Sequence, residues 1–147
     1  MSDDLQRFME AQNEVWPAVE AELRAGRKES HWMWFVFPQL AGLGTSAMAQ
    51  RYALADRAEA EAYLAHPVLG PRLREAAGWV LSHPDRDAED ILGGIDAAKL
   101  RSCATLFERV AGESGGPGVF RELLATFYGG EEDPRTVKLL GGRGPRQ

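Results

Sequence analysis

Residues 29 to 46 carry the sequence ESHWMWFVFPQLAGLGTS, which holds two of the chain's four tryptophans, two of its six phenylalanines and one of its three histidines. Every position from 32 to 37 is apolar, so the run is either a buried strand or a helix buried on all sides. Because the rest of the chain offers no second convincing strand, we favour a short buried helix or extended segment that ends at Pro38. The fold class depends on this segment, since the flanking sequence is helical in pattern.

The flanking sequence predicts a series of short helices. Apolar side chains recur at helical spacing between residues 4 and 25, where Pro17 is expected to divide two helices and Gly26 to end the second. Later helices are expected to begin at three capping aspartates, Asp56, Asp96 and Asp133.

These signals predict an all-α fold, a compact single-domain bundle of about seven to eight short helices, and not a Rossmann fold. The domain is expected to span residues 1–140, followed by a flexible C-terminal tail at 141–147. The run GESGGPG at 112–118 is expected to be a flexible linker.

The composition limits the classes of function. A net charge of -5 over 147 residues argues against general nucleic-acid binding, although a local basic pocket for a nucleotide stays compatible with it. The N-terminus shows no signal peptide and no apolar run is long enough to span a bilayer, so we expect a cytoplasmic protein without a membrane partner. Cys103 is the lone cysteine and the three histidines lack metal-ligand spacing, so neither a metal nor a cofactor is expected.

The run GLGTSA at 42–47 matches the dinucleotide fingerprint G-x-G-x-x-A. That fingerprint requires a strand that leads directly into the glycines, whereas residues 38–41 intervene here and no second strand follows. We therefore expect a tight turn and a helix capped by Thr45 or Ser46. A glycine turn before a helix N-terminus also suits a phosphate or a carboxylate, so Gly42 and Gly44 stay candidate ligand contacts.

His31 differs from the other two histidines because it lies in the densest aromatic zone, whereas His66 and His83 each precede a proline at a helix end. An imidazole in that zone is a candidate acid or base, or a donor to an anion, and the alternative is a satisfied residue in the core or at its rim. In the run DAAKLRSCATLF, Lys99 is a candidate anion contact, and the alternative is an exposed helix cation.

Four segments of the chain together resemble the DUF1810 family, bacterial proteins of unknown function. They are RKESHWMWFVFPQLAGLGTSAMAQRYAL (27–54), AEAYLAHPVLGPRLRE (60–75), KLRSCATLF (99–107) and FYGGEEDPRTVKLL (127–140). The resemblance runs from Leu5 to about Leu140 and implies a compact all-α domain without an established reaction. Some members carry a calpastatin-like label, which does not suit the composition of a folded domain. A Ser-His-Trp-Met segment with a later helical Lys-Leu-Arg is also similar to NADAR proteins, which implies ADP-ribose-type N-glycosides as a ligand class.

The leading hypothesis is a pocket around residues 28–44 that binds, and in its catalytic form hydrolyses, a small anionic nucleotide or ADP-ribose-like compound. His31 is the catalytic candidate, and an N-glycosidic or related bond the expected target; whether the chain is an enzyme stays open. The predicted ligand contacts are Lys28, Ser30, Trp32, Trp34, Gln39, Gly42, Gly44, Lys99 and Arg101.

Two other hypotheses compete with the pocket. The segment HWMWFVFPQ at 31–39 can belong to a non-enzymatic protein-interaction module, or to a core or docking surface without a ligand. Alternatively the segment is structural and function lies elsewhere, for instance around His66-Pro67 and Arg72.

Overall fold

A computed structural model describes residues 3–111 and 118–141 of the chain. The described residues form an all-α fold of nine helices, as the sequence predicts, with a helix count close to the expected seven to eight. In chain order the helices are α1 (Asp3–Ala25), α2 (Met33–Val36), α3 (Ala47–Arg51), α4 (Arg57–Ala65), α5 (Leu69–Leu81), α6 (Ala88–Leu92), α7 (Gly94–Ala111), α8 (Val119–Tyr128) and α9 (Pro134–Leu139). The predicted linker, apart from Gly118, and the predicted tail beyond Gly141 lie outside the described residues.

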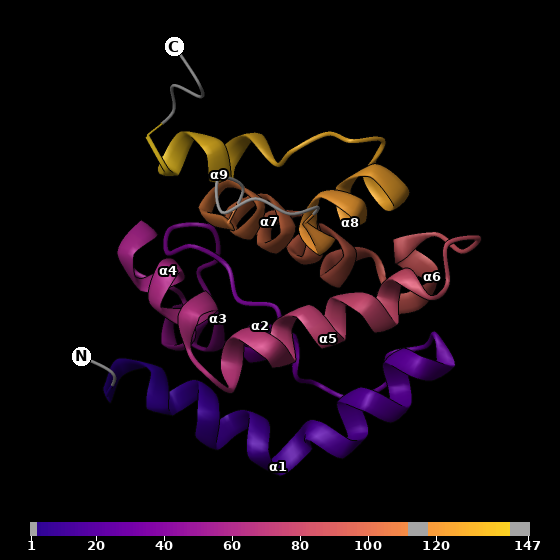
Figure 1. Cartoon of the computed structure of the whole chain (residues 1–147), viewed down its shortest axis with the longest axis horizontal. Coiled ribbons are helices and arrows are strands. Elements are labelled where there is room, and N and C mark those ends of the chain that lie inside the picture. Colours follow the sequence, from indigo (N-terminus) through magenta and orange to yellow (C-terminus); the bar gives the residue numbers. More distant parts are fainter. Residues whose placement is uncertain (1–2, 112–117, 142–147) are drawn as a thin grey trace.

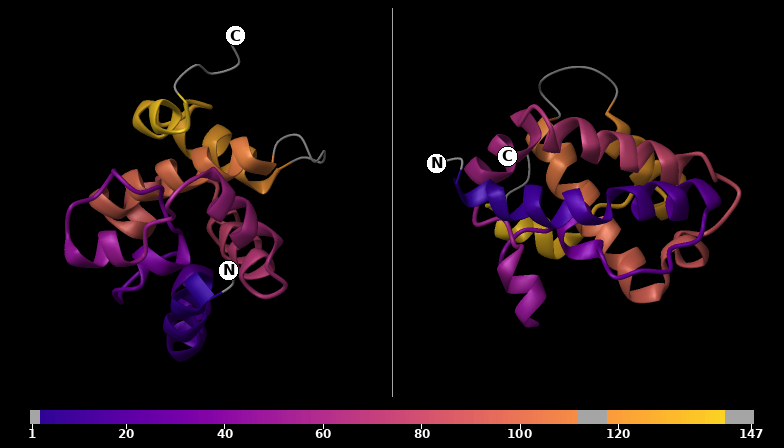
Figure 2. Two further views of the ribbon diagram at one scale, coloured as in Figure 1. Left: turned by 90° about the vertical axis from the view of Figure 1, so that its left-hand side faces the viewer. Right: turned by 90° about the horizontal axis from the view of Figure 1, so that it is seen from below.

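The central helix of the arrangement is α7, which packs against α4, α6, α8 and α9. On the other side of the core α5 contacts α1, α4 and α8, and Figures 1 and 2 show α1 along the outer side of α5. Aromatic rings connect these layers. Phe8 of α1 meets Tyr63 of α4 at 5.1 Å between centroids, Tyr63 meets Phe107 of α7 at 5.6 Å, and Phe107 meets Phe120 of α8 at 5.6 Å. One continuous hydrophobic core therefore holds the helices together.

The expectation that Pro17 divides two helices is wrong, because α1 runs unbroken from Asp3 to Ala25 with Pro17 inside it. Figure 1 shows that α1 bends in its middle. A proline removes one backbone hydrogen bond and crowds the preceding turn, so an interior proline kinks a helix whose packed face keeps it continuous. Gly26 ends α1 as predicted, with a φ of 77° that favours glycine.

The aromatic run that decides the fold class forms a buried helix, as we favoured. α2 covers only residues Met33–Val36, and Trp32, Met33, Val36 and Phe37 are all at most 1% exposed. After Pro38 the chain is extended, and Leu40 forms an isolated parallel bridge with Leu54 that does not grow into a strand in the described part of the chain. Two backbone hydrogen bonds hold this bridge: Ala41 N–H donates to Leu54 O at 2.8 Å, and Leu54 N–H donates to Gln39 O at 2.9 Å.

Helix ends follow the sequence signals with one exception. The side chains of Ser46, Asp56 and Asp133 accept hydrogen bonds from the first turns of α3, α4 and α9, and Pro134 opens α9. Asp96 does not begin its helix, because α7 starts two residues earlier at Gly94. The carboxylate of Asp96 lies inside the first turn and is directed to lysines instead. No helix of the described residues is long and apolar enough to cross a membrane.

Candidate functional site

The loop between α1 and α2 is organised by one carboxylate, that of Glu22 near the C-terminal end of α1. This carboxylate accepts hydrogen bonds from the N–H groups of Glu29 at 2.8 Å and Ser30 at 3.0 Å, from Ser30 Oγ at 2.5 Å, and from the indole Nε1 of Trp32 at 2.9 Å. Burial by itself raises the pKa of the Glu22 carboxyl, but these four hydrogen bonds outweigh it and lower the pKa to about 2. Glu22 is therefore ionised at neutral pH and fixes the loop that carries the predicted site residues.

Two lysines share a single carboxylate directly beside this loop. Lys28 Nζ lies 2.9 Å from Asp96 Oδ2 and also donates to the carbonyl of Ser30 at 2.6 Å. Lys99 Nζ lies 3.6 Å from Asp96 Oδ1. The Lys28 side chain is 8% exposed and the Lys99 side chain 23% exposed, so Lys99 is the more accessible cation.

Each of the two lysines also lies over one indole ring of the aromatic run. Lys28 Nζ is 5.0 Å from the ring centroid of Trp32, and Lys99 Nζ is 5.1 Å from that of Trp34. Trp32 is fully buried, whereas Trp34 is half-buried and packs against the edge of the core. The structure thus brings together Lys28, Trp32, Trp34 and Lys99 around Asp96, a group that we call the lysine pair cluster.

The remaining candidates from the aromatic stretch lie at its margin. His31 is exposed, next in sequence to Trp32. Gln39 is half-buried, and its backbone carbonyl is taken by Leu54.

The glycine turn forms a tight loop on the far side of Pro38. Gly42 has a φ of 102°, which favours glycine, and a Cβ there would be in ordinary van der Waals contact with Leu139 of α9 at 3.4 Å. A Cβ on Gly44 would stand only 2.6 Å from the Cβ of Ala49. Ser46 Oγ accepts from Ala49 N–H at 3.1 Å, which confirms one of the two predicted caps. The glycines therefore have a structural explanation in the close packing of this turn.

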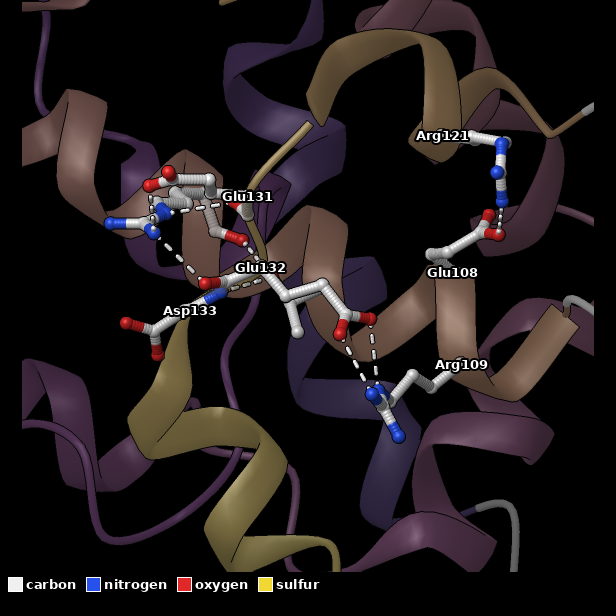
Figure 3. A network of polar contacts seen from close by, with 8 residues as sticks. Glu108, Arg109, Arg121, Glu131, Glu132 and Asp133 are labelled. Carbon is white, nitrogen blue, oxygen red and sulfur yellow. Dashed lines mark hydrogen bonds and ion pairs between the residues drawn. The ribbon is translucent and has the colours of Figure 1, made fainter. Parts of the chain in front are cut away.

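Arg101 belongs to a different surface from the lysine pair cluster. Its guanidinium donates to the backbone carbonyls of Glu131 at 3.0 Å and Glu132 at 2.9 Å and lies 3.6 Å from the Glu131 carboxylate. Nearby, both guanidinium contacts of Arg109 go to the Glu132 carboxylate, at 2.9 and 2.7 Å. Figure 3 shows this Arg109–Glu132 pair, and these contacts tie the segment before α9 to α7. Arg101 and Lys99 diverge because residues two apart point about 200° apart around a helix.

At the alternative site, the side chains of His66 and Arg72 both contact neighbouring parts of the fold. The Nδ1 atom of His66 accepts from two N–H groups at the start of α5, both at 3.1 Å. The Arg72 guanidinium donates to Gln12 Oε1 at 3.3 Å and lies 5.1 Å from a ring centroid of Trp16. His83 likewise serves a helix end, since its Nε2 lies 2.9 Å from a carbonyl in the last turn of α1.

Comparison with known proteins places this arrangement in a family. The model of DUF1810, described as a protein of unknown function, matches residues 2–140, nearly the whole chain. The chain belongs to the DUF1810 family. The structure is similar to the crystal structure of the conserved hypothetical protein Rv1873 from Mycobacterium tuberculosis, with 52% sequence identity, a TM-score of 0.89, and coverage of 93% of this chain and 96% of that one. The curated proteins gave no match.

Two cavities of this DUF1810 chain border Arg101. One, of about 410 Å³, lies where α6, α7 and the end of α8 meet and includes Tyr128 and Asp133 in its wall. The other, of about 970 Å³ and wide open to solvent, lies along α9 and includes Glu131 and Lys138. Among the residues predicted for the site, Arg101 is the one that lines these cavities.

Two residues essential to the geometry escaped the sequence analysis in this role. Glu22 follows the helical pattern of α1, and nothing local to it indicates that the chain turns back at Gly26 to place Ser30 and Trp32 on its carboxylate. Asp96 was predicted only as a helix cap, whereas its carboxylate is the counter-ion of Lys99 and of Lys28, which lies 68 positions earlier in the sequence. Contacts across such separations leave no mark in a single sequence. In the described residues no group of three histidine, cysteine or acidic side chains is arranged to hold a metal ion.

Proposed function

We propose that the chain is a small-ligand-binding domain whose ligand is anionic and carries a planar ring, such as a nucleotide or an ADP-ribose-like compound. The observation that carries this proposal is the placement of Lys99 Nζ 5.1 Å from the ring centroid of the half-buried Trp34. A ring of the ligand stacks on the exposed part of Trp34, and Lys99 meets its phosphate or carboxylate.

The two lysines of the lysine pair cluster support an anion. The ammonium groups of Lys28 and Lys99 share the one carboxylate of Asp96, while the ionised carboxylate of Glu22 is held by the Ser30 and Trp32 donors of the loop. Lys28 is nearly buried and is held by Asp96 and the Ser30 carbonyl, which makes it the structural member. Lys99 is more exposed and sits at the longer distance from Asp96, so it is the member that is free to turn toward a ligand.

The catalytic form of the proposal is hydrolysis of an N-glycosidic or related bond at the same surface. Water supplies the hydroxyl group that replaces the leaving nitrogen, His31 supplies the proton that the nitrogen takes up, and the proton released by the water returns to His31. Its exposed imidazole and its position next to Trp32 in the loop held by Glu22 support this role. A bacterial origin, a cytoplasmic location and the absence of general nucleic-acid or membrane binding are further parts of this proposal.

Isothermal titration calorimetry with ADP-ribose and AMP, compared with uncharged adenosine, tests the proposal. We expect the two anions to bind more tightly than adenosine and Lys99→Gln to weaken them about tenfold or more, since a charged hydrogen bond is lost. Lys138→Gln is the matched control, because Lys138 is an exposed lysine on α9 away from the cluster. His31→Ala is expected to retain binding and lose any release of the base. Equal affinities for Lys99→Gln and Lys138→Gln, or no binding of either anion, would refute the proposal.

One observation favours the alternative of a protein-interaction module. Ile95 of α7 is 77% exposed and lies one turn before Lys99 on the same face of the helix. Most of the segment 31–39 is in the core, so a docking surface would be made by Ile95 and Trp34 rather than by the aromatic run as a whole. A molecular mass in light scattering that rises with concentration, and that Ile95→Asp restores to the monomer, would support a second copy of the chain as the partner.

A further inference from the structure

The cavity of about 410 Å³ lies on the face of α7 opposite to the lysine pair cluster. Its floor is made by Gly94, Ala97 and Ala98, which stand at positions i, i+3 and i+4 and therefore share one helix face. Asp96 and Lys99 lie roughly half a turn away from that face. The small floor residues leave the hollow open, and its volume falls in the range of small-molecule sites.

The wall on the side of α8 is aromatic and fixed in place. Phe127 and Tyr128, both half-buried, line it at the end of the helix. The Tyr128 hydroxyl donates to the carbonyl of Ala97 at 2.6 Å, which anchors the ring against the backbone of α7. The two aromatic rings and the alanine floor give one side of the cavity an apolar surface that also attracts cations, while the rest of the lining is polar.

The rim of the cavity carries an excess of negative charge. Asp87 and Glu89 line it from α6 and its N-terminal cap, and Asp133 lines it from the cap of α9. Within the described residues none of these three carboxylates forms an ion pair. The one cation of the lining, Arg101, is held by the carboxylate of Glu131 and by two backbone carbonyls.

We propose that this cavity binds a small organic amine, an alkylammonium group on an apolar stem. The ammonium group is attracted first by the exposed carboxylate of Glu89, and the helix-capping carboxylates of Asp87 and Asp133 add negative charge at the rim. The stem packs on the two aromatic rings and the alanine floor. A small anion is repelled by the same rim. A bare metal ion fits poorly, because the carboxylates of the described residues do not converge on one point. The site is independent of the anion site proposed at Trp34 and Lys99.

Calorimetric titration of the full chain with n-pentylamine at pH 7, and with 1-pentanol as a neutral molecule of the same shape, tests the charge requirement. We expect saturable binding of the amine and none of the alcohol. Glu89→Gln removes one rim charge at an exposed position and is expected to weaken the amine about two- to fivefold, the range for a solvent-accessible ion pair. Glu122→Gln, an exposed carboxylate on α8 outside the cavity lining, is the matched control and is expected to leave the affinity unchanged.

A second pair of variants tests the volume of the cavity without changing charge. Ala98→Leu places a larger side chain in the floor at an exposed helix position and is expected to abolish binding of the amine. Ala125→Leu makes the same change at an exposed position of α8 away from the lining and is expected to bind as the wild type does. Circular dichroism confirms that all four variants are folded. The inference is overturned by three results: no saturable heat with n-pentylamine, equal binding of 1-pentanol, or Glu89→Gln and Ala98→Leu behaving like their controls.

Discussion

Replacement of Glu22 by glutamine tests the claim that one carboxylate organises the loop that carries the candidate anion site. Glutamine keeps a carbonyl oxygen that still accepts from the N–H groups of Glu29 and Ser30 and from the Trp32 indole, so the substitution removes the charge and little of the shape. In the folded protein the pKa of Glu22 is lowered from 4.5 to about 2, a shift equivalent to about 3 kcal/mol at 1.36 kcal/mol per unit. The carboxylate is half-buried and screened by solvent, so we expect a loss of about 1–2 kcal/mol in the free energy of unfolding at pH 7.

The dependence on pH distinguishes this effect from an ordinary packing defect. Because the pKa of Glu22 is lower in the folded state than in the unfolded chain, its contribution is complete above a pH of about 4.5 and is lost as the pH falls toward 2. Urea denaturation of wild type and Glu22→Gln at several pH values between 7 and 3 should therefore show the difference in unfolding free energy shrinking below pH 4.5. At a pH of about 3 it should be less than half of its value at neutral pH.

The matched control for this experiment is Glu20→Gln on the same helix. The Glu20 side chain is 42% exposed and pairs with Arg24 one turn later, at 2.7 Å, so its loss is expected to cost only about 0.3–0.5 kcal/mol. If Glu22→Gln is no more destabilising than Glu20→Gln at pH 7, the carboxylate does not organise the loop. A difference from wild type that stays constant down to pH 3 would equally refute the account, because it would show that the charge plays no part.

Two further predictions concern helix packing and buried tyrosines. Gly70→Ala should destabilise the fold by more than about 3 kcal/mol in urea denaturation, since its Cβ would lie 2.1 Å from the carbonyl oxygen of Leu64. Gly78→Ala on the same helix is the control, because its Cβ meets nothing within 4 Å, and it should stabilise the fold by about 0.5–1 kcal/mol. Equal effects of the two substitutions would contradict the packing. Burial raises the pKa of both Tyr63 and Tyr128 above the ordinary 10.0, so the unfolded chain loses these protons first and the unfolding free energy should fall above pH 10 by up to about 1.4 kcal/mol per pH unit for each tyrosine. Denaturation between pH 9 and 11 checks this, and a flat profile would show that the hydroxyls are accessible.

The fold class could be predicted from the sequence because its signals are local. Caps at Asp56 and Asp133 and the helical spacing of apolar residues each involve a few neighbouring positions, and the structure confirms them. Pro17 was misjudged for a reason that is not local: α1 packs along α5, and tertiary contacts along this face keep the helix continuous through a residue that would end it in isolation. Local propensity predicts a helix boundary correctly where tertiary contacts do not oppose it, and at Pro17 the contacts between α1 and α5 do oppose it.

The candidate site likewise depends on tertiary contacts of single side chains that local sequence patterns do not reveal. In the aromatic run the sequence offers a choice of apolar residues, and only the rotation of a four-residue helix decides that Trp34 stays partly exposed while Trp32 is buried. Lys28 and Lys99 form one cluster because both contact the carboxylate of Asp96. The capping signal at Asp96 predicted that the helix begins there, whereas α7 begins two residues earlier at Gly94 and includes Asp96 in its first turn. The same register places Ala97, Ala98 and Arg101 on the opposite face, where they line the smaller cavity. The rotation from one residue of α7 to the next therefore decides which of its residues serve the proposed anion site and which serve the proposed amine site. Exchanging Asp96 for asparagine should affect the first site and leave the second unchanged.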